Sequence, residues 1–175
     1  ISEILKAGRA SLERRGFIEV VTPRVVRATG ACENVNTLFE VSVSKDFKWF
    51  GSSAYLAQTG QLYLEALVSQ YQKVYCSGPS FRAEAIVDSR HLIEFLMMEI
   101  EFIGGFDQLL QEIEAFISDI AKTLVNLSQT QDLGLGAENV KRLAGCPEVF
   151  TKLTYDEAIA KLQELGEQIN WGDDI

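Results

Sequence analysis

The chain has few of the residues that build metal centres and disulfide frameworks. Its 175 residues include one histidine and three cysteines, Cys32, Cys76 and Cys146, without a CxxC pair. Zinc is normally held by four Cys, His or carboxylate ligands, the cysteines often in closely spaced pairs. We therefore expect no metal site in this segment. The cysteines are expected to be free thiols in the core of a protein from a reducing compartment.

Long apolar runs and an excess of basic residues are also missing. No apolar run approaches the roughly 20 residues of a membrane span, and the opening ISEILKAGRASLERR mixes acids with bases, unlike a targeting peptide. These features indicate a cytoplasmic protein with no membrane contact. The 16 basic and 25 acidic residues give a net charge of -9, which argues against extensive nucleic-acid binding by this segment alone. A few well-placed arginines can still hold ATP.

What is present is a hydrophobic fraction of 47%, enough for the core of one domain. Apolar residues at helical spacing predict helices over 4–15, from Gln61 onward, over 106–127 and over 154–167, with a short one at 140–143. The positions expected to face the core from the first three are Ile4, Leu5, Leu12, Leu64, Leu67, Val68, Tyr71, Leu109, Ile113, Phe116, Ile117, Ile120 and Leu124.

Strands are expected over 17–21 and 38–43, with a hairpin connection at 42–49. The sequence TYDE predicts that the last helix begins with a capping box, in which Thr154 is the N-cap and Glu157 bonds back to it.

The most informative stretch is FRAEAIVDSRHLIEFLMMEIEF, residues 81–102. Its two ends alternate with a period of two, as strands do, which places Arg82 and Glu84 on one face. In the second strand the alternation separates a core face from a site face. The core face holds Leu96, Met98, Ile100 and Phe102, and the site face holds Phe95, Met97, Glu99 and Glu101. In an antiparallel hairpin, the polar loop with Arg90 and His91 would lie next to the site face.

This combination of side chains suits a nucleotide. Arginine holds phosphate through its planar fork, a glutamate accepts from an exocyclic amine, and an aromatic ring stacks on a base. The other interpretation is an ordinary hairpin whose solvent face is salt-bridged, and Glu101 in particular is expected to be a surface carboxylate.

A second polar set follows Thr59 and Gly60. Gln61 and Glu65 lie one turn apart on a helix and share a face, where they suit an ammonium group and an amide. The Gly- and Asn-containing loop before Leu38 carries Glu33. That loop is open to two interpretations, a functional loop or an ordinary surface loop.

The strings FRAE, SRHL and EF resemble motif 2 of class II aminoacyl-tRNA synthetases, closest to the aspartyl and asparaginyl branch. GFIEVVTPRVV resembles motif 1, and TGQLYLEA is similar to the substrate-binding helix of asparaginyl enzymes. The resemblance implies an α+β fold, an antiparallel sheet flanked by helices, incomplete at its C-terminal end. It implies one partial catalytic domain over 1–175. Its parts are motif 1 at about 1–27, the amino-acid loop and helix at 28–72, motif 2 at about 74–102 and a helical part at 104–175.

The resemblance also implies roles on the nucleotide side. Arg82 would be the catalytic residue and would hold the α-phosphate and the substrate carboxylate. Glu84 would bind the adenine amine, His91 the γ-phosphate, and Phe95 would stack on adenine. Arg90 is a further phosphate-binding candidate.

On the amino-acid side, the resemblance implies that Glu33 contacts the α-amino group, that Glu99 joins it, and that Gln61 and Glu65 complete the pocket. Aspartyl enzymes usually have proline in place of Gly60, and lysine where this chain has leucine four positions later. Glu65 would accept from the asparagine amide and repel aspartate.

The implied function is ATP- and Mg²⁺-dependent activation of asparagine to an adenylate and transfer to tRNA by an intact, homodimeric parent that associates through motif 1. Motif 3 and the magnesium ligands are expected beyond Ile175, so this segment alone is expected to be inactive. Two alternatives stay open. One is a tRNA-independent paralogue that amidates aspartate to asparagine, and the other is a non-catalytic dimerisation or regulatory fragment.

Overall fold

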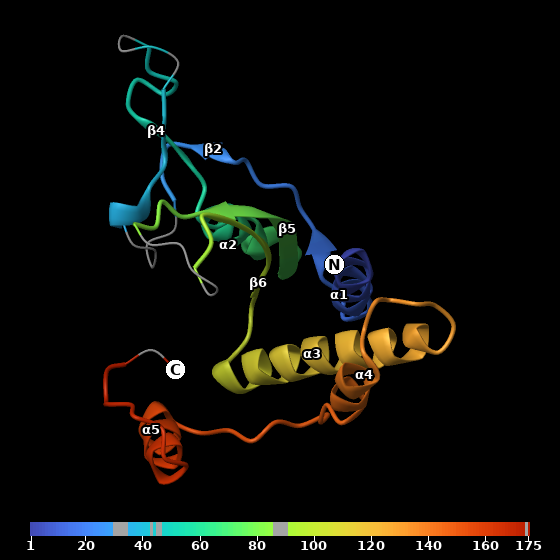
Figure 1. Cartoon of the computed structure of the whole chain (residues 1–175). Helices are drawn as coiled ribbons and strands as arrows, with labels where there is room; N and C mark the ends of the chain where they lie inside the picture. The colour runs from blue at the N-terminus through green and yellow to red at the C-terminus, as the bar shows by residue number, and fades with distance from the viewer. Residues whose placement is uncertain (30–34, 43, 45–46, 86–90, 174) are drawn as a thin grey trace.

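The computed structural model describes residues 1–29, 35–42, 44, 47–85, 91–173 and 175 (Figure 1). The helices are α1 (Ser2–Arg14), α2 (Gln61–Tyr71), α3 (Phe106–Ser128), α4 (Ala137–Ala144) and α5 (Tyr155–Glu164), with a 3-10 turn at Val35–Thr37. The strands are β1 (Ile18–Glu19), β2 (Val25–Val26), β3 (Glu40–Val41), β4 (Ala54–Leu56), β5 (Lys73–Phe81) and β6 (Glu94–Phe102).

The strands form two sheets. The first has the order β1-β5-β6, and its centre is the expected hairpin, paired antiparallel from Lys73 opposite Phe102 to Phe81 opposite Glu94. The small second sheet has the order β2-β4-β3 and is antiparallel throughout. The mixed α and β fold with antiparallel sheets is therefore confirmed. One pair departs from the expectation, because β1 runs parallel to β5.

The two faces of the β5–β6 hairpin are covered by different helices. On one face Leu12 of α1, Phe17 and Tyr75 are buried together, and Phe116 of α3 packs against them. On the other face Leu64 of α2 is buried with residues of β5. Side chains directly opposite each other in an antiparallel pair share a face, and Glu99 lies opposite Cys76. The predicted site face is consequently the face beneath α2.

Helical spacing and strand alternation placed several residues wrongly. Five of the side chains expected in the core are exposed: Ile4, Tyr71, Leu96, Ile113 and Ile117. The cause is clearest on α3, which lies against α1 (Figure 1). There the buried side chains include Glu112, Glu114 and Ser118, so the inner face of the helix is partly polar.

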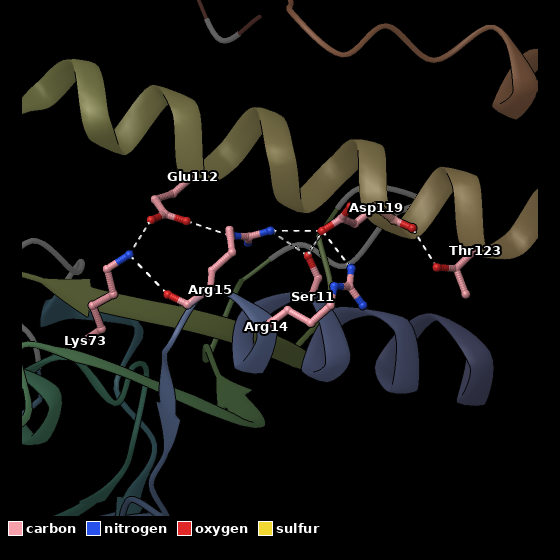
Figure 2. A network of polar contacts seen from close by, with 7 residues as sticks. All are labelled: Ser11, Arg14, Arg15, Lys73, Glu112, Asp119 and Thr123. Atoms are coloured by element: carbon pink, nitrogen blue, oxygen red, sulfur yellow. Dashed lines mark hydrogen bonds and ion pairs between the residues drawn. The ribbon is translucent and has the colours of Figure 1, made fainter.

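The polar residues of α3 pair with α1 and β5 across the helix interface (Figure 2). Arg15 Nε donates to Glu112 Oε2 at 2.7 Å, and Lys73 Nζ donates to Glu112 Oε1 at 2.8 Å. Asp119 Oδ2 accepts from Ser11 Oγ at 2.5 Å and from Arg15 Nη1 at 3.1 Å. These long-range pairs are invisible to a local pattern, which explains the misplaced isoleucines.

Electrostatics favour the ionised form of Asp119. Burial raises its pKa, but the hydrogen bond from Ser11 and the charges of Arg14 and Arg15 outweigh burial, and the pKa lies below its usual value. A carboxylate whose pKa is lower in the folded state stabilises the fold above its unfolded pKa. That stabilisation is lost as the pH falls through the folded pKa.

Breaking this network should destabilise the protein. The Arg15 and Glu112 side chains are 19% and 8% exposed, and without Arg15 the buried Glu112 carboxylate keeps only its pairing with Lys73. We expect Arg15→Met to lower the free energy of unfolding by about 1 to 3 kcal/mol through this lost charged hydrogen bond, measured by urea denaturation. The control is Lys6→Met, which removes an exposed pair with Glu3 and should cost no more than about 0.5 kcal/mol. Equal losses in the two variants would contradict the role given to the network.

The C-terminal helices agree with their sequence signals. Helix α4 includes the short helix expected at 140–143. Helix α5 begins with the expected capping box, in which Thr154 and Glu157 exchange hydrogen bonds. No helix in the described ranges is both long and apolar enough to cross a membrane.

Two cysteines can be compared with their prediction. Cys76 and Cys146 are free thiols, as expected. Cys76 is buried, whereas Cys146 is only half-buried, so its expected place in the core was wrong. Cys32 lies outside the described residues.

Candidate active site

The nucleotide-type residues come together where the β5–β6 hairpin ends. They line a cavity of about 250 Å³, whose walls are Arg82, Glu84, His91, Leu92 and Phe95. Strand β5 ends at Phe81, so Arg82 and Glu84 belong to irregular chain, not to the strand that the alternation predicted. The backbone N–H of Arg82 donates to the carbonyl of Ile93 at 2.9 Å. This bond joins the two sides of the hairpin next to the cavity.

The cavity offers a cation, an aromatic face, a carboxylate and an imidazole in one place. Arg82 lies over the Phe95 ring, with Cζ 5.4 Å from the ring centroid, within the range of a cation–π contact. Phe95 lies opposite Ser80 and therefore on the α2 face of the sheet. Four of the residues that the sequence grouped therefore line one cavity, and their binding roles stay predictions. Arg90, the further phosphate-binding candidate, lies outside the described residues.

On the amino-acid side, the structure brings Gln61 and Glu65 into contact. Gln61 Nε2 donates to Glu65 Oε1 at 2.8 Å across one turn of α2, as the helical spacing predicts. Gln61 is half-buried and Glu65 is exposed. Glu33, expected at the α-amino group, lies outside the described residues.

Glu99 lies at the start of α2. Its carboxylate accepts from the Gly60 N–H, at 2.9 Å to Oε1 and 3.1 Å to Oε2, and from the Thr59 hydroxyl. A carboxylate at a helix N-terminus satisfies unpaired N–H groups and is stabilised by the helix dipole. Glu99 thus joins β6 to the helix that carries Gln61 and Glu65, a contact that the strand pattern gave no reason to expect.

Three carboxylates gather beside this helix. Burial raises the pKa of Glu101, and the neighbouring charges of Glu65 and Glu99 raise it further. Glu101 is half-buried, so the expectation of a simple surface carboxylate was wrong. The concentration of negative charge is a suitable environment for the ammonium group of an amino acid.

The approach of α2 to the sheet depends on a glycine. A Cβ at Gly60 would lie 2.7 Å from Cys76 Sγ and 3.0 Å from Thr22 Oγ1. Both distances are shorter than ordinary van der Waals contacts, so a side chain here would push the helix from the strand. A glycine just before a helix is a sequence signal for such a contact, but its neighbours cannot be read from the sequence.

Gly60→Ala should therefore lower the free energy of unfolding by about 1 to 3 kcal/mol through overpacking. In a Cys76→Ala background the same change should cost less, because the nearer of the two obstructing atoms is gone. A double-mutant cycle by urea denaturation measures this coupling. Gly145→Ala is the control, since its Cβ would meet the nearest atom at 3.5 Å. Additive costs of Gly60→Ala and Cys76→Ala would contradict the contact.

The chain is similar to one family of enzymes over nearly its whole length. The family model for class II tRNA synthetases (D, K and N) matches residues 1–172. Among curated relatives, the asparagine–tRNA ligase of Koribacter versatilis is 34% identical over 180 residues, covering 99% of this chain and 39% of the relative. That of Desulforamulus reducens is 35% identical over 176 residues, with the same coverage of 99% and 39%. The chain thus spans about two-fifths of these relatives.

Solved structures show the same similarity. Asparaginyl-tRNA synthetase from Pyrococcus horikoshii, complexed with asparaginyl-adenylate, matches with a TM-score of 0.80 at 33% identity, over 99% of this chain and 38% of that one. The Entamoeba histolytica asparaginyl-tRNA synthetase, also in complex with asparaginyl-adenylate, matches with a TM-score of 0.71 at 26% identity, over 99% and 37% of the two chains.

Proposed function

Because the chain belongs to the class II tRNA synthetases of the D, K and N type, we propose that it is part of a catalytic domain that activates asparagine with ATP. The observation that carries the proposal is the cavity lined by Arg82, Glu84, His91 and Phe95, on the side of the sheet where α2 presents Gln61 and Glu65. Solved relatives with asparaginyl-adenylate support this reading. The domain limits are proposed as motif 1 at about 1–27, the amino-acid loop and helix at 28–72, motif 2 at about 74–102 and a helical part at 104–175.

In the proposed reaction a carboxylate oxygen of asparagine attacks the α-phosphorus of ATP, and the bond to the leaving pyrophosphate breaks. Arg82 neutralises charge on the α-phosphate and orients the carboxylate, which lowers the barrier through position and electrostatics. Phe95 stacks on adenine, Glu84 accepts from its amine, His91 contacts the γ-phosphate, and Arg90 is a further candidate for phosphate binding.

Mg²⁺ would supply further charge neutralisation at the phosphates. Within the described ranges, no group of three or more His, Cys, Asp or Glu side chains is arranged to hold a metal ion. The expectation that the magnesium ligands lie beyond Ile175, and that residues 1–175 alone are inactive, stays a prediction.

Selectivity for asparagine is proposed to come from Glu65. Its carboxylate already accepts from the primary amide of Gln61 at 2.8 Å, and the amide of a bound asparagine has the same donor group. Aspartate would place a second negative charge beside Glu65, Glu99 and Glu101, which is unfavourable. Leu64, where aspartyl enzymes usually have lysine, is completely buried and supplies no charge. The α-amino group is assigned to Glu33 and Glu99.

The proposed partners are tRNA and a second copy of the chain, in the cytoplasm. Support for the dimer comes from the motif 1 segment, where Ile18, Val21 and Val25 are apolar and exposed, Val21 at 99%. Such a surface favours contact with a protein partner. With a net charge of -9, most of the tRNA is expected to contact other parts of the natural protein.

Product analysis tests the proposed function. The natural full-length protein, given ATP, Mg²⁺, tRNA and labelled asparagine, should form acid-precipitable asparaginyl-tRNA. The net negative charge favours the amidating alternative, in which aspartate and ammonia yield free asparagine without tRNA. Formation of free asparagine from aspartate would replace the proposed function with that alternative. Neither product would indicate a non-catalytic dimerisation or regulatory fragment.

A further inference from the structure

Arg24 lies over the middle of β5, on the face covered by α2. After β1 the chain continues beside β5, where the Val20 N–H donates to the Tyr75 carbonyl at 2.8 Å. A Cβ at Gly78 would lie 2.7 Å from Arg24 Cζ. The guanidinium therefore occupies the space that any other side chain at position 78 would fill, and glycine at this position has a specific structural reason.

The guanidinium is left with unused hydrogen-bonding capacity. Arg24 Nη1 is buried and has no hydrogen-bond partner, and no carboxylate in the described part of the chain forms an ion pair with this residue. A buried donor without a partner costs free energy and calls for an explanation. For a cation with a planar fork of donors, an anion is the expected partner.

The position of Arg24 indicates which anion this is. In the hairpin, Gly78 lies between Cys76, which faces Glu99, and Ser80, which faces Phe95. Arg24 also lowers the pKa of the Cys76 thiol, although burial and Glu99 raise it more. The guanidinium is thus placed between the carboxylates beside α2 and the cavity at Phe95. In the proposed reaction, the ammonium group of the amino acid lies at the carboxylates and the α-phosphate lies at Arg82. The amino-acid carboxylate therefore lies between them, next to Arg24.

We propose that Arg24 binds the α-carboxylate of the amino-acid substrate and that Gly78 makes room for it. This inference rests on the proposed function and adds a second arginine to the assignment of Arg82. Arg24 contacts the carboxylate from the middle of β5, and Arg82 contacts it from the end of the β5–β6 hairpin. The bound carboxylate would satisfy the buried Nη1 donor.

Calorimetric binding to the natural full-length protein tests the inference without requiring turnover. Arg24→Met should weaken asparagine binding about 10- to 100-fold, the loss expected for one hydrogen bond between charged groups. Binding of L-asparaginol, in which a CH₂OH group replaces the carboxylate, should be the same in wild type and Arg24→Met. Arg24→Lys should show an intermediate loss, because lysine keeps the charge without the planar fork. Arg142→Met, an exposed arginine on α4, should bind asparagine normally.

A second variant keeps the arginine. Gly78→Ala displaces the guanidinium and should weaken asparagine binding while leaving asparaginol binding unchanged. Equal losses for the two ligands, a loss for ATP only, or a changed dimer fraction in Arg24→Met would overturn the inference and leave the proposed function standing. A wild-type protein that binds aspartate and not asparagine would instead overturn the proposed choice of amino acid.

Discussion

Arg82→Ala is expected to reduce asparagine-dependent ATP–pyrophosphate exchange in the natural full-length protein by at least about a hundredfold to a thousandfold. The reason is that Arg82 is proposed to hold both reacting groups, the α-phosphate and the carboxylate. Removing a preorganised donor from a developing charge costs catalysis more than it costs ground-state binding. Steady-state exchange rates at saturating substrates measure the effect.

The fold should survive this substitution. Alanine keeps the hydrogen bond that the backbone N–H of Arg82 donates to the Ile93 carbonyl, and it removes the side-chain contact with Phe95 at the edge of the cavity. Circular dichroism and the urea midpoint should therefore match those of the wild type within about 0.5 to 1 kcal/mol. Arg142→Ala on α4 is the matched control and should retain full exchange. Retention of exchange by folded Arg82→Ala would remove the role assigned to Arg82.

Glu65→Gln is expected to lower the preference for asparagine over aspartate by about 10- to 100-fold, expressed as the ratio of kcat/KM values in exchange. The substitution keeps a hydrogen-bond acceptor for Gln61 but removes a negative charge that repels aspartate. Most of the change should appear as improved use of aspartate, since the glutamine carbonyl still accepts from the asparagine amide.

The control for this prediction is Glu164→Gln, an exposed glutamate on α5, which should leave the ratio unchanged. If Glu65→Gln also leaves it unchanged, the side-chain pocket has been assigned to the wrong carboxylate, and Glu99 or Glu101 becomes the first candidate for the selective contact.

Local patterns predicted the elements that are determined locally. Strand β6, the helix beginning at Gln61 and the capping box of Thr154 follow from period-two alternation, helical spacing and cap chemistry. The strand paired with β6 is Lys73–Phe81, so it ends where the alternation had placed its beginning. Helix α3 was also found, but its inner face was not. Ile113 is exposed and Glu112 is buried, because Arg15, just after α1, and Lys73 of β5 pair with that carboxylate. Both partners are far from Glu112 in sequence.

In the candidate site, too, local features were predicted and contacts between distant segments were not. The residue types at the nucleotide cavity were available from the sequence strings, and the structure brings Arg82, Glu84, His91 and Phe95 to one cavity. The close contacts at Gly60 and Gly78 could not be predicted from the sequence, because each depends on tertiary packing against another segment. Arg24 is far along the chain from Gln61, Arg82 and Glu99, and its local pattern carried no signal.

The most direct test of the account is amino-acid-dependent ATP–pyrophosphate exchange by the natural full-length protein, with asparagine and aspartate compared at equal concentrations. Exchange that depends on asparagine, with little from aspartate, is the predicted result, because adenylate formation is the reaction assigned to this site. Exchange with aspartate alone, or with neither amino acid, would contradict the account.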